Sequence, residues 1–359
     1  MNEDKAARYH RQKRVLSVAS VIWSAALLAG LLATRGSIAL RDLARGYALV
    51  YVVLLTLTNE VGALPLAFYS GYRLERRYGL STETPGAWLW DQAKSFAIAV
   101  VLGGGAAALI YAFIRRSPDG WWLSAGAVFA VLIVVLTNLA PVLLLPLFYT
   151  VKPLARDGLR ARLLALADRA GARVLGAYEW GLAEKTKKAN AALAGIGRTR
   201  RILVSDTMLA DYSDDEIEVV LAHELAHHVH RDIWKGIVFE AGLILAGFYL
   251  ASRTLSALAP PLGLQSVADI AGLPLLVLAA GAVSLVMAPL AHAMSRTFER
   301  SADRFALRLT RNPSAFISAM RRLGAQNLAE EHPSRLVQWL FYSHPPLAVR
   351  IGAAEAFKT

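Results

Sequence analysis

Six long apolar segments restrict this 359-residue chain to the folds that a lipid bilayer permits. Roughly 20 apolar residues in a helix cross the hydrocarbon layer, which is about 30 Å thick. The residues are 55% hydrophobic and 18% charged, which excludes an ordinary soluble globular protein. The predicted spans are residues 15–34, 46–72, 95–114, 120–151, 236–252 and 270–295. The fourth is too long for one crossing, so we expect its end to project into water.

Charge predicts the orientation of the spans. Basic residues precede the first span at Lys5, Arg8, Arg11, Lys13 and Arg14. This cluster favours a cytoplasmic N-terminus, and an even number of crossings then returns both polar stretches of the chain, 152–235 and 296–359, to the cytoplasm. We attribute the net charge of +12 to orientation and to contact with anionic lipids of the bilayer. We predict no nucleic-acid binding, because the chain has neither aromatic interleaving nor a known motif for it.

Residues 223–227 read His-Glu-Leu-Ala-His and carry the strongest chemical signal in the chain. On a helix, His223 and His227 project from one face, close enough to share a metal ion, and Glu224 is placed to take a proton from a metal-bound water. Ser213 and Glu216 match a capping box, and apolar residues then recur at helical spacing with no Gly or Pro before Gly236. The alternative interpretation is a surface helix that happens to carry two histidines.

A catalytic zinc usually has three protein ligands, so a third is needed. The chain has no cysteine, and any metal must be held by His, Asp or Glu. His230 lies about 10 Å from His223 along the helix axis, too far to share one ion. Glu299 is the better candidate, because it follows the sixth span on the same membrane side. Asp303, one helical turn later, can hold the second nitrogen of a ligand histidine. The alternative is a solvated helix with alternating charges.

The alternation of apolar and polar regions predicts four parts. Residues 1–151 form an N-terminal membrane region with about four spans, and residues 152–235 form the catalytic domain with the His-Glu helix. Residues 236–295 add two further spans, and residues 296–359 are the C-terminal part of the catalytic domain. Neither polar stretch is large enough for a core of its own, so we expect the two to pack together.

Three motifs, in order, give the chain a family resemblance. The His-Glu-Leu-Ala-His pentad is followed by Arg-Thr-Phe-Glu-Arg-Ser-Ala-Asp at 296–303 and by Ser-His-Pro-Pro-Leu-Ala-Val-Arg-Ile at 343–351. This order resembles the type I CAAX prenyl proteases, which are integral-membrane zinc metallopeptidases related more distantly to the heat-shock membrane protease HtpX. Shorter similarities lie in residues 75–94, 146–154 and 190–207.

The resemblance implies a mainly α-helical polytopic membrane protein with about six, or seven, transmembrane helices and a zincin-like cytoplasmic catalytic domain that contains a small β-sheet. It makes His223, His227 and Glu299 the ligands of one Zn²⁺ per chain. Glu224 would be the general base. His344 would donate a hydrogen bond to the developing oxyanion.

The resemblance also implies residues that support these groups and bind substrate. Asp303 is expected to hold a ligand histidine, and Arg350 to pair with a carboxylate in the site. An extended substrate would bind along an edge strand, with contacts from Asn190, Ala191 and Gly195. The family commonly has an aromatic residue where this chain has Ala192, which bears on substrate preference.

The expected activity is hydrolysis of peptide bonds in a protein or peptide substrate. The resemblance implies removal of the C-terminal tripeptide of prenylated proteins, and membrane-protein quality control is the second role we consider. One alternative function is a polytopic metal transporter or sensor that uses the histidines at 223, 227, 228 and 230. Another is a membrane scaffold with a vestigial site. Neither alternative requires Glu224, Glu299 and His344 together, whereas hydrolysis does.

Overall fold

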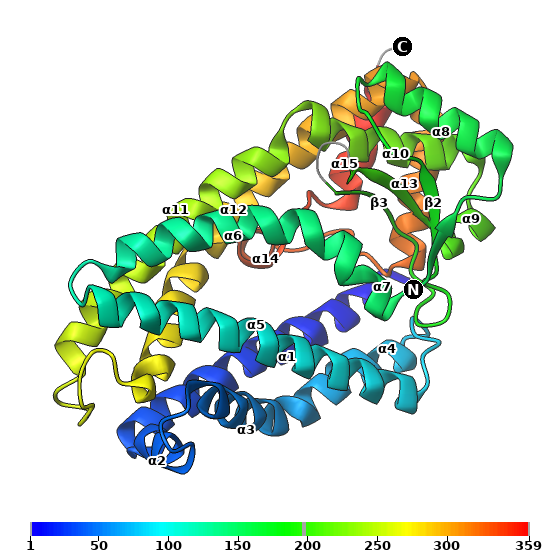
Figure 1. The fold of residues 1–359 in the computed structure, drawn as a ribbon. Helices are drawn as coiled ribbons and strands as arrows, with labels where there is room; N and C mark the ends of the chain where they lie inside the picture. The colour runs from blue at the N-terminus through cyan, green and yellow to red at the C-terminus, as the bar shows by residue number, and fades with distance from the viewer. Residues whose placement is uncertain (1, 196–198, 358–359) are drawn as a thin grey trace.

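The computed structural model describes residues 2–195 and 199–357 and is mainly helical. Long helices form an elongated body, and a small β-sheet lies at one end of it beside α8 and α10 (Figure 1). The long helices are α1 (Asn2–Ala33), α3 (Ala48–Phe68), α5 (Pro85–Arg116), α6 (Trp121–Leu143), α11 (Asp232–Leu258) and α12 (Leu273–Thr310). The shorter ones are α2 (Gly36–Leu43), α4 (Leu74–Arg77), α7 (Leu145–Phe148), α8 (Asp157–Arg169), α9 (Asp206–Asp211), α10 (Asp214–Val229), α13 (Pro313–Gln326), α14 (Arg335–Phe341) and α15 (Leu347–Glu355).

Five helical segments within the described residues are long and apolar enough to cross a membrane. They are Lys5–Ala33, Ala48–Arg77, Pro85–Arg116, Asp232–Leu258 and Ile270–Thr310. The second joins α3 to α4 through a π-helical turn, Tyr69–Arg73. The last begins with a single 3₁₀ turn, Ile270–Gly272. These segments coincide with five of the six predicted spans.

The fourth predicted span differs from the other five. It gives a shorter apolar helix, Trp121–Thr137, and the chain then breaks into α7 and the strand β1 (Val151–Pro153). Pro146 lies in the first turn of α7 and has no N–H to continue the hydrogen-bond ladder of α6. The end of this long apolar segment therefore leaves the helix, as its length requires.

Two helix ends also lie away from their predicted positions. The sixth predicted span ends at residue 295, but α12 continues without a break to Thr310. The sequence shows no Gly or Pro before Gly236, yet α10 ends at Val229. Arg231 takes a left-handed conformation with φ 56° and separates α10 from α11. This turn ends α10 and starts α11 just after the His-Glu motif.

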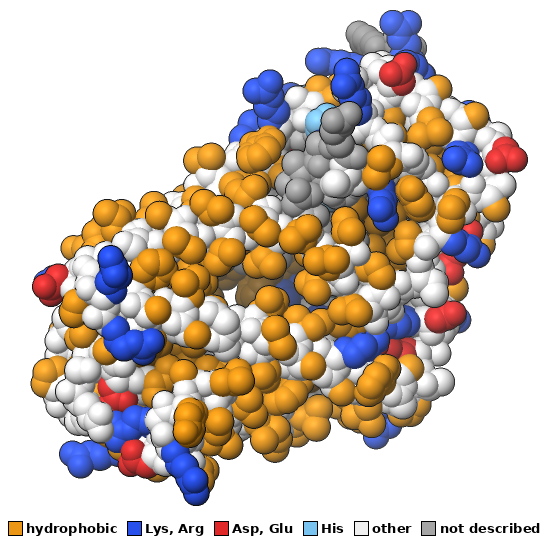
Figure 2. Space-filling model, in the orientation of Figure 1, with side chains coloured by type: hydrophobic (Ala, Val, Ile, Leu, Met, Phe, Trp, Pro, Cys, Tyr) orange, Lys and Arg blue, Asp and Glu red, His pale blue; other side chains and the backbone are white. Residues whose placement is uncertain are grey.

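The surface over the long helices is apolar. Figure 2 shows hydrophobic side chains across the middle of this face and charged side chains mostly toward its two ends, with a hollow between them in the region of α5 and α6. Val101, Val238 and Val286 lie within three of the predicted spans, and each side chain is at least 70% exposed. An exposed apolar surface of this extent is costly in water and is typical of helices that face lipid.

The sheet has four short strands in the order β1-β2-β4-β3. Strand β2 (Ala177–Trp180) pairs antiparallel with β1 and parallel with β4 (Arg201–Ser205). Strand β3 (Ala191–Ala194) pairs antiparallel with β4, in the register Ala191 to Val204, and packs beside α10. Because no described strand pairs with its other side, β3 is an edge strand that lies next to the His-Glu helix.

The two polar stretches of the sequence share one hydrophobic core. Buried side chains between Leu154 and Leu225 pack with others between Ala306 and Ala354. Helix α10 lies in the middle of this core, where it contacts α8, α12 and α13. Its apolar side is fully buried, which explains the helical spacing of its apolar residues.

Helix α10 begins with the predicted capping box. The Ser213 hydroxyl accepts a hydrogen bond from the Glu216 N–H at 3.3 Å, and the Ser213 N–H donates to Glu216 Oε2 at 2.8 Å. The other oxygen of Glu216 accepts hydrogen bonds from Ser318 Oγ at 2.6 Å and Arg322 Nε at 2.9 Å, both on α13. Glu216 is only 3% exposed. One carboxylate thus starts the His-Glu helix and joins it to α13.

We expect Glu216→Gln to destabilise the protein by about 1–3 kcal/mol, because it weakens charge-assisted hydrogen bonds at a buried position. Thermal denaturation of the purified protein in detergent measures this. The matched control is Asp215→Asn in the same helical turn, since Asp215 pairs with Arg162 at the surface. The control should change stability by less than about 0.5 kcal/mol. Equal transition midpoints for the two variants would show that Glu216 does not join the helices.

Candidate active site

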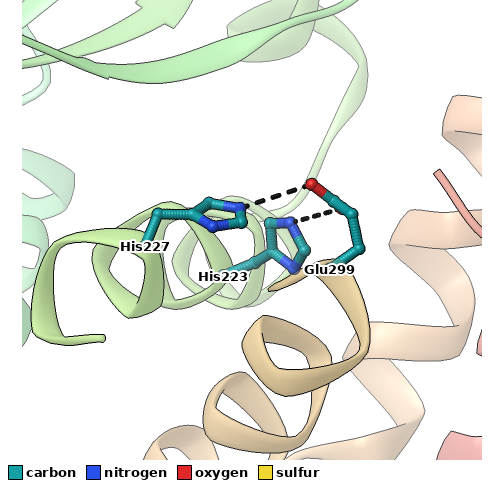
Figure 3. Close-up of side chains that lie close together, drawn as sticks. All are labelled: His223, His227 and Glu299. Carbon is teal, nitrogen blue, oxygen red and sulfur yellow. Dashed lines mark ion pairs between the residues drawn. The ribbon is translucent and has the colours of Figure 1, made fainter. Parts of the chain in front are cut away.

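Two histidines of α10 and one glutamate of α12 meet at one point (Figure 3). His223 Nε2 lies 3.2 Å from Glu299 Oε2, and His227 Nε2 lies 3.4 Å from Glu299 Oε1. One potential ligand atom from each of the three side chains lies within 4.8 Å of the others. Helical spacing puts the two imidazoles on the same face of α10, with their ring centroids 5.1 Å apart. The uninterrupted α12 carries Glu299 past the apolar part of the helix to reach them.

The chemistry of this group fits a divalent metal ion. Glu299 Oε2 is buried and, although it lies 3.2 Å from His223 Nε2, it accepts no hydrogen bond from the residues that the structure describes. A buried carboxylate oxygen without a donor is unfavourable, and a cation between it and the two Nε2 atoms would satisfy it. Two imidazoles and one carboxylate are also a donor set that catalytic zinc sites use, with a fourth position open to water.

The second nitrogen of each histidine is already held. His223 Nδ1 lies 2.9 Å from Asp303 Oδ1, and His227 Nδ1 lies 3.1 Å from Asp232 Oδ2. Carboxylates in this position fix the tautomer and the ring orientation of a metal-binding histidine, so that Nε2 faces the ion. Arg350 of α15 in turn donates two hydrogen bonds to Asp303, at 2.9 and 2.6 Å.

The sequence reasoning identified Asp303 but missed Asp232. Asp232 lies five residues after His227, which on an unbroken helix would place it more than 100° around the axis. The left-handed turn at Arg231 brings it back to His227 instead. The only signal in the sequence was an acidic residue at the start of an apolar segment. The turn that brings this residue to His227 contains no Gly or Pro, so the sequence did not indicate it.

Glu224 and His344 face a cavity of about 360 Å³ beside the three residues. Burial raises the pKa of Glu224 above its ordinary value, although the neighbouring His223 opposes this. His344 Nε2 lies 3.4 Å from Glu299 Oε1, and the His344 side chain is 60% exposed. Its Nδ1 lies 2.9 Å from Ser343 Oγ. The cavity therefore gives a substrate access to a carboxylate and an imidazole close to the candidate metal ligands.

Of the three residues predicted to bind substrate, the structure brings two to the cavity. Asn190 and Ala191 line it at the start of β3, whereas Gly195 follows the far end of this strand and does not. Gly195 has φ 89°, and a Cβ there would lie 2.8 Å from the Thr199 carbonyl oxygen. The backbone conformation and the close contact both require glycine at this position. Sequence reasoning also missed Asn327, whose side-chain amide pairs with both backbone groups of Ala189.

The other histidines of the motif region lie elsewhere. His228 Nε2 is 3.2 Å from Arg200 Nη1. His230 Nδ1 lies 3.4 Å from Ser301 Oγ, and its ring meets Phe305 edge-on. The four histidines therefore do not form one metal-binding face, which the transporter or sensor alternative would need.

Comparisons with known proteins agree along nearly the whole chain. Residues 2–150 match the family model "CAAX prenyl protease N-terminal, five membrane helices", and residues 153–358 match "Peptidase family M48". An uncharacterized metalloprotease of Bacillus subtilis, YhfN, is 33% identical over 85% of this chain and 72% of its own length. CAAX prenyl protease 1 of Saccharomyces cerevisiae is 28% identical over 86% of this chain and 72% of its own.

The fold is similar to a solved structure. The crystal structure of S. mikatae Ste24p superimposes with a TM-score of 0.87 and 25% sequence identity, covering 98% of this chain and 88% of that one. The N-terminal family model describes five membrane helices, whereas residues 2–150 here contain the four long helices α1, α3, α5 and α6 together with the short α2.

The fold and the site together define an integral multi-pass membrane metalloprotease. The chain belongs to peptidase family M48, and within it to the CAAX prenyl protease type. The family resemblance found in the sequence is therefore confirmed. The comparisons give the transporter alternative no support.

The geometry predicts which substitutions remove the metal. Glu299→Gln should lower the metal content of the purified protein sharply, because a neutral amide is a poor ligand. His230→Ala should bind metal as the unmodified protein does, since His230 lies outside the group of three. Elemental analysis of both variants measures this. Normal metal content in Glu299→Gln together with loss in His230→Ala would contradict the ligand set.

Proposed function

We propose that this protein is a zinc endopeptidase that holds one zinc ion through His223, His227 and Glu299. The observation that carries the proposal is the convergence of these side chains beside a cavity that also contains Glu224. The Nδ1 atoms of His223 and His227 are already held by the carboxylates of Asp303 and Asp232, so the two imidazoles need little reorganisation to bind the ion.

The metal site, Glu224 and His344 would each have a separate role in hydrolysis. When bound, zinc would polarise the scissile carbonyl and lower the pKa of a coordinated water. Glu224 accepts the proton of the attacking water and passes it to the leaving amine. His344 donates a hydrogen bond from Nε2 to the oxygen that becomes negative in the transition state.

An extended substrate would bind along the unpaired side of β3. The backbone of residues 191–194 offers hydrogen bonds to one more strand, and Asn190 leads this strand into the cavity. The substrate backbone would then pass over Glu224 and the metal. Substrates of this protein are proteins or peptides, as its family implies.

We place the catalytic domain on the cytoplasmic side. The basic residues ahead of α1 favour a cytoplasmic N-terminus. His227 and Glu299 must share one side because they meet, and α11 and α12 between them supply two crossings. An even number of crossings also separates the N-terminus from β1 when α6 is counted as a span.

The proposed substrate class is the prenylated C-terminus, from which the enzyme would release a tripeptide. The names of the CAAX prenyl protease relatives support this class. Membrane-protein quality control is the second candidate, because the relative from Bacillus subtilis carries no prenyl designation in its name. Both roles use the same peptidase site. They differ in the part of the substrate that faces the membrane, which is a prenyl group in the first role and a segment of a membrane protein in the second.

The general-base role predicts a separation of metal binding from activity. Glu224→Gln should keep its zinc, because Glu224 is not among the three ligands, and should lose peptidase activity by several orders of magnitude. Zinc content and cleavage of a fluorogenic peptide are measured on the same preparation. Glu218→Gln on the solvent side of α10 is the control and should keep both. Loss of zinc from Glu224→Gln would show that the role assignment is wrong.

A pair of peptides tests the substrate class. A peptide farnesylated on the cysteine of a C-terminal Cys-aliphatic-aliphatic-X sequence should be cleaved before the last three residues much faster than its unmodified twin. The prenyl group adds about 0.8 kcal/mol of binding for each CH₂ that it buries, so the difference should be large. Mass spectrometry identifies the cleaved bond. Equal rates for both peptides would reject prenyl recognition and favour quality control.

A further inference from the structure

A second pocket lies behind the candidate metal site, where α10 turns into α11. Its volume is about 360 Å³, and the side chains of its wall include Arg200, His227, His228, Arg231 and Trp234. The described residues that line it include no acidic side chain. Of these residues the peptidase mechanism uses only His227, whose Nε2 faces Glu299 in the candidate metal site. A pocket lined by two arginines and two histidines but no carboxylate is suited to an anion.

Arg200 is the residue that most needs an explanation. It is only 6% exposed, and its Nε is buried without a hydrogen-bond partner. Its Nη1 lies 3.4 Å from the Arg173 carbonyl oxygen and 3.2 Å from His228 Nε2. Both partners are neutral acceptors, and the structure shows no ion pair of Arg200 with a described residue. A buried cation without a counter-anion is strongly unfavourable.

The position of the pocket indicates the kind of anion. Trp234 is half exposed in the first turn of α11, the helix that then continues as a predicted membrane span. Tryptophan is enriched at this level, where lipid headgroups meet water. The guanidinium fork of arginine matches the oxygens of a phosphate group, and a phosphate with several waters fits in the measured volume, since one water takes about 30 Å³.

We propose that this pocket binds a phosphate group, held by Arg200 and Arg231. The phosphate comes either from an anionic phospholipid headgroup or from free phosphate. Binding would fix the turn at Arg231, on either side of which lie His227 and its partner Asp232. The proposal concerns binding alone, so it goes beyond the peptidase function and can fail or succeed independently of it.

The test measures binding to the purified full-length protein. Native mass spectrometry and thermal denaturation are carried out with phosphatidylglycerol, with phosphatidylcholine, and with sodium phosphate against sodium chloride at equal ionic strength. Phosphatidylcholine is the lipid control, because its choline cation offsets the charge of its phosphate and leaves the headgroup with no net charge. The variants are Arg200→Gln and Arg231→Gln. Arg308→Gln, which removes an exposed cation of α12 outside the pocket, is the matched control.

Phosphatidylglycerol should bind the unmodified protein and Arg308→Gln equally, and each of the two pocket variants about tenfold more weakly. This result identifies the headgroup as the source. If only sodium phosphate shows the same dependence on the pocket arginines, the source is free phosphate and the proposal still holds. Absence of binding, or equal binding to all variants, would overturn it. If Arg200→Gln does not fold, Arg231→Gln decides, because the Arg231 side chain is exposed.

Discussion

The meeting of Glu299 with His223 and His227 is the constraint on which the rest of the structure depends. These residues lie on α10 and α12, and the whole of α11 separates them in the chain. Helices α11 and α12 must therefore form a hairpin that returns to the end from which it started. Helix α12 must also continue as one helix beyond its apolar part, because a break there would move Glu299 out of reach.

The charges at this point are tolerated because nearly all of them are paired. Asp303 holds His223 and is itself held by Arg350, while Lys235 donates to Asp232 at 2.9 Å. Removing either partner from such a pair leaves a buried charge, which costs more than the pair contributes. Helix α15 supplies Arg350 and so makes the C-terminal region part of the site. The buried Oε2 of Glu299 accepts no hydrogen bond from a described residue, and it lies at the point where a metal would bind.

Sequence reasoning reached the parts of this structure that depend on local pattern. The capping box at Ser213, the spacing of His223 and His227, and the apolar lengths of five spans are all readable within a few turns of helix. The left-handed turn at Arg231 was not readable, because it contains no Gly or Pro to mark it. Asp232 and the Arg200 pocket depend on this turn and were missed with it. Asn327 was missed because its pairing with Ala189 joins positions 138 residues apart.

In the proposed binding mode, the edge strand β3 limits how the enzyme can select its substrates. The backbone groups of Ala189 are already bonded to the Asn327 side chain, so a substrate strand can pair only from residue 190 onward. The strand β3 is four residues long and reads Ala-Ala-Leu-Ala, with small side chains at three positions. Backbone pairing along this strand gives affinity but little discrimination, because side-chain pockets are what distinguish sequences. Selectivity must therefore come from the cavity beside Glu224 and from the apolar surfaces of the spans. Under the proposed binding mode, a membrane protease with this edge strand would recognise the part of its substrate that lies in the cavity or the bilayer, and would accept sequence variation along the strand.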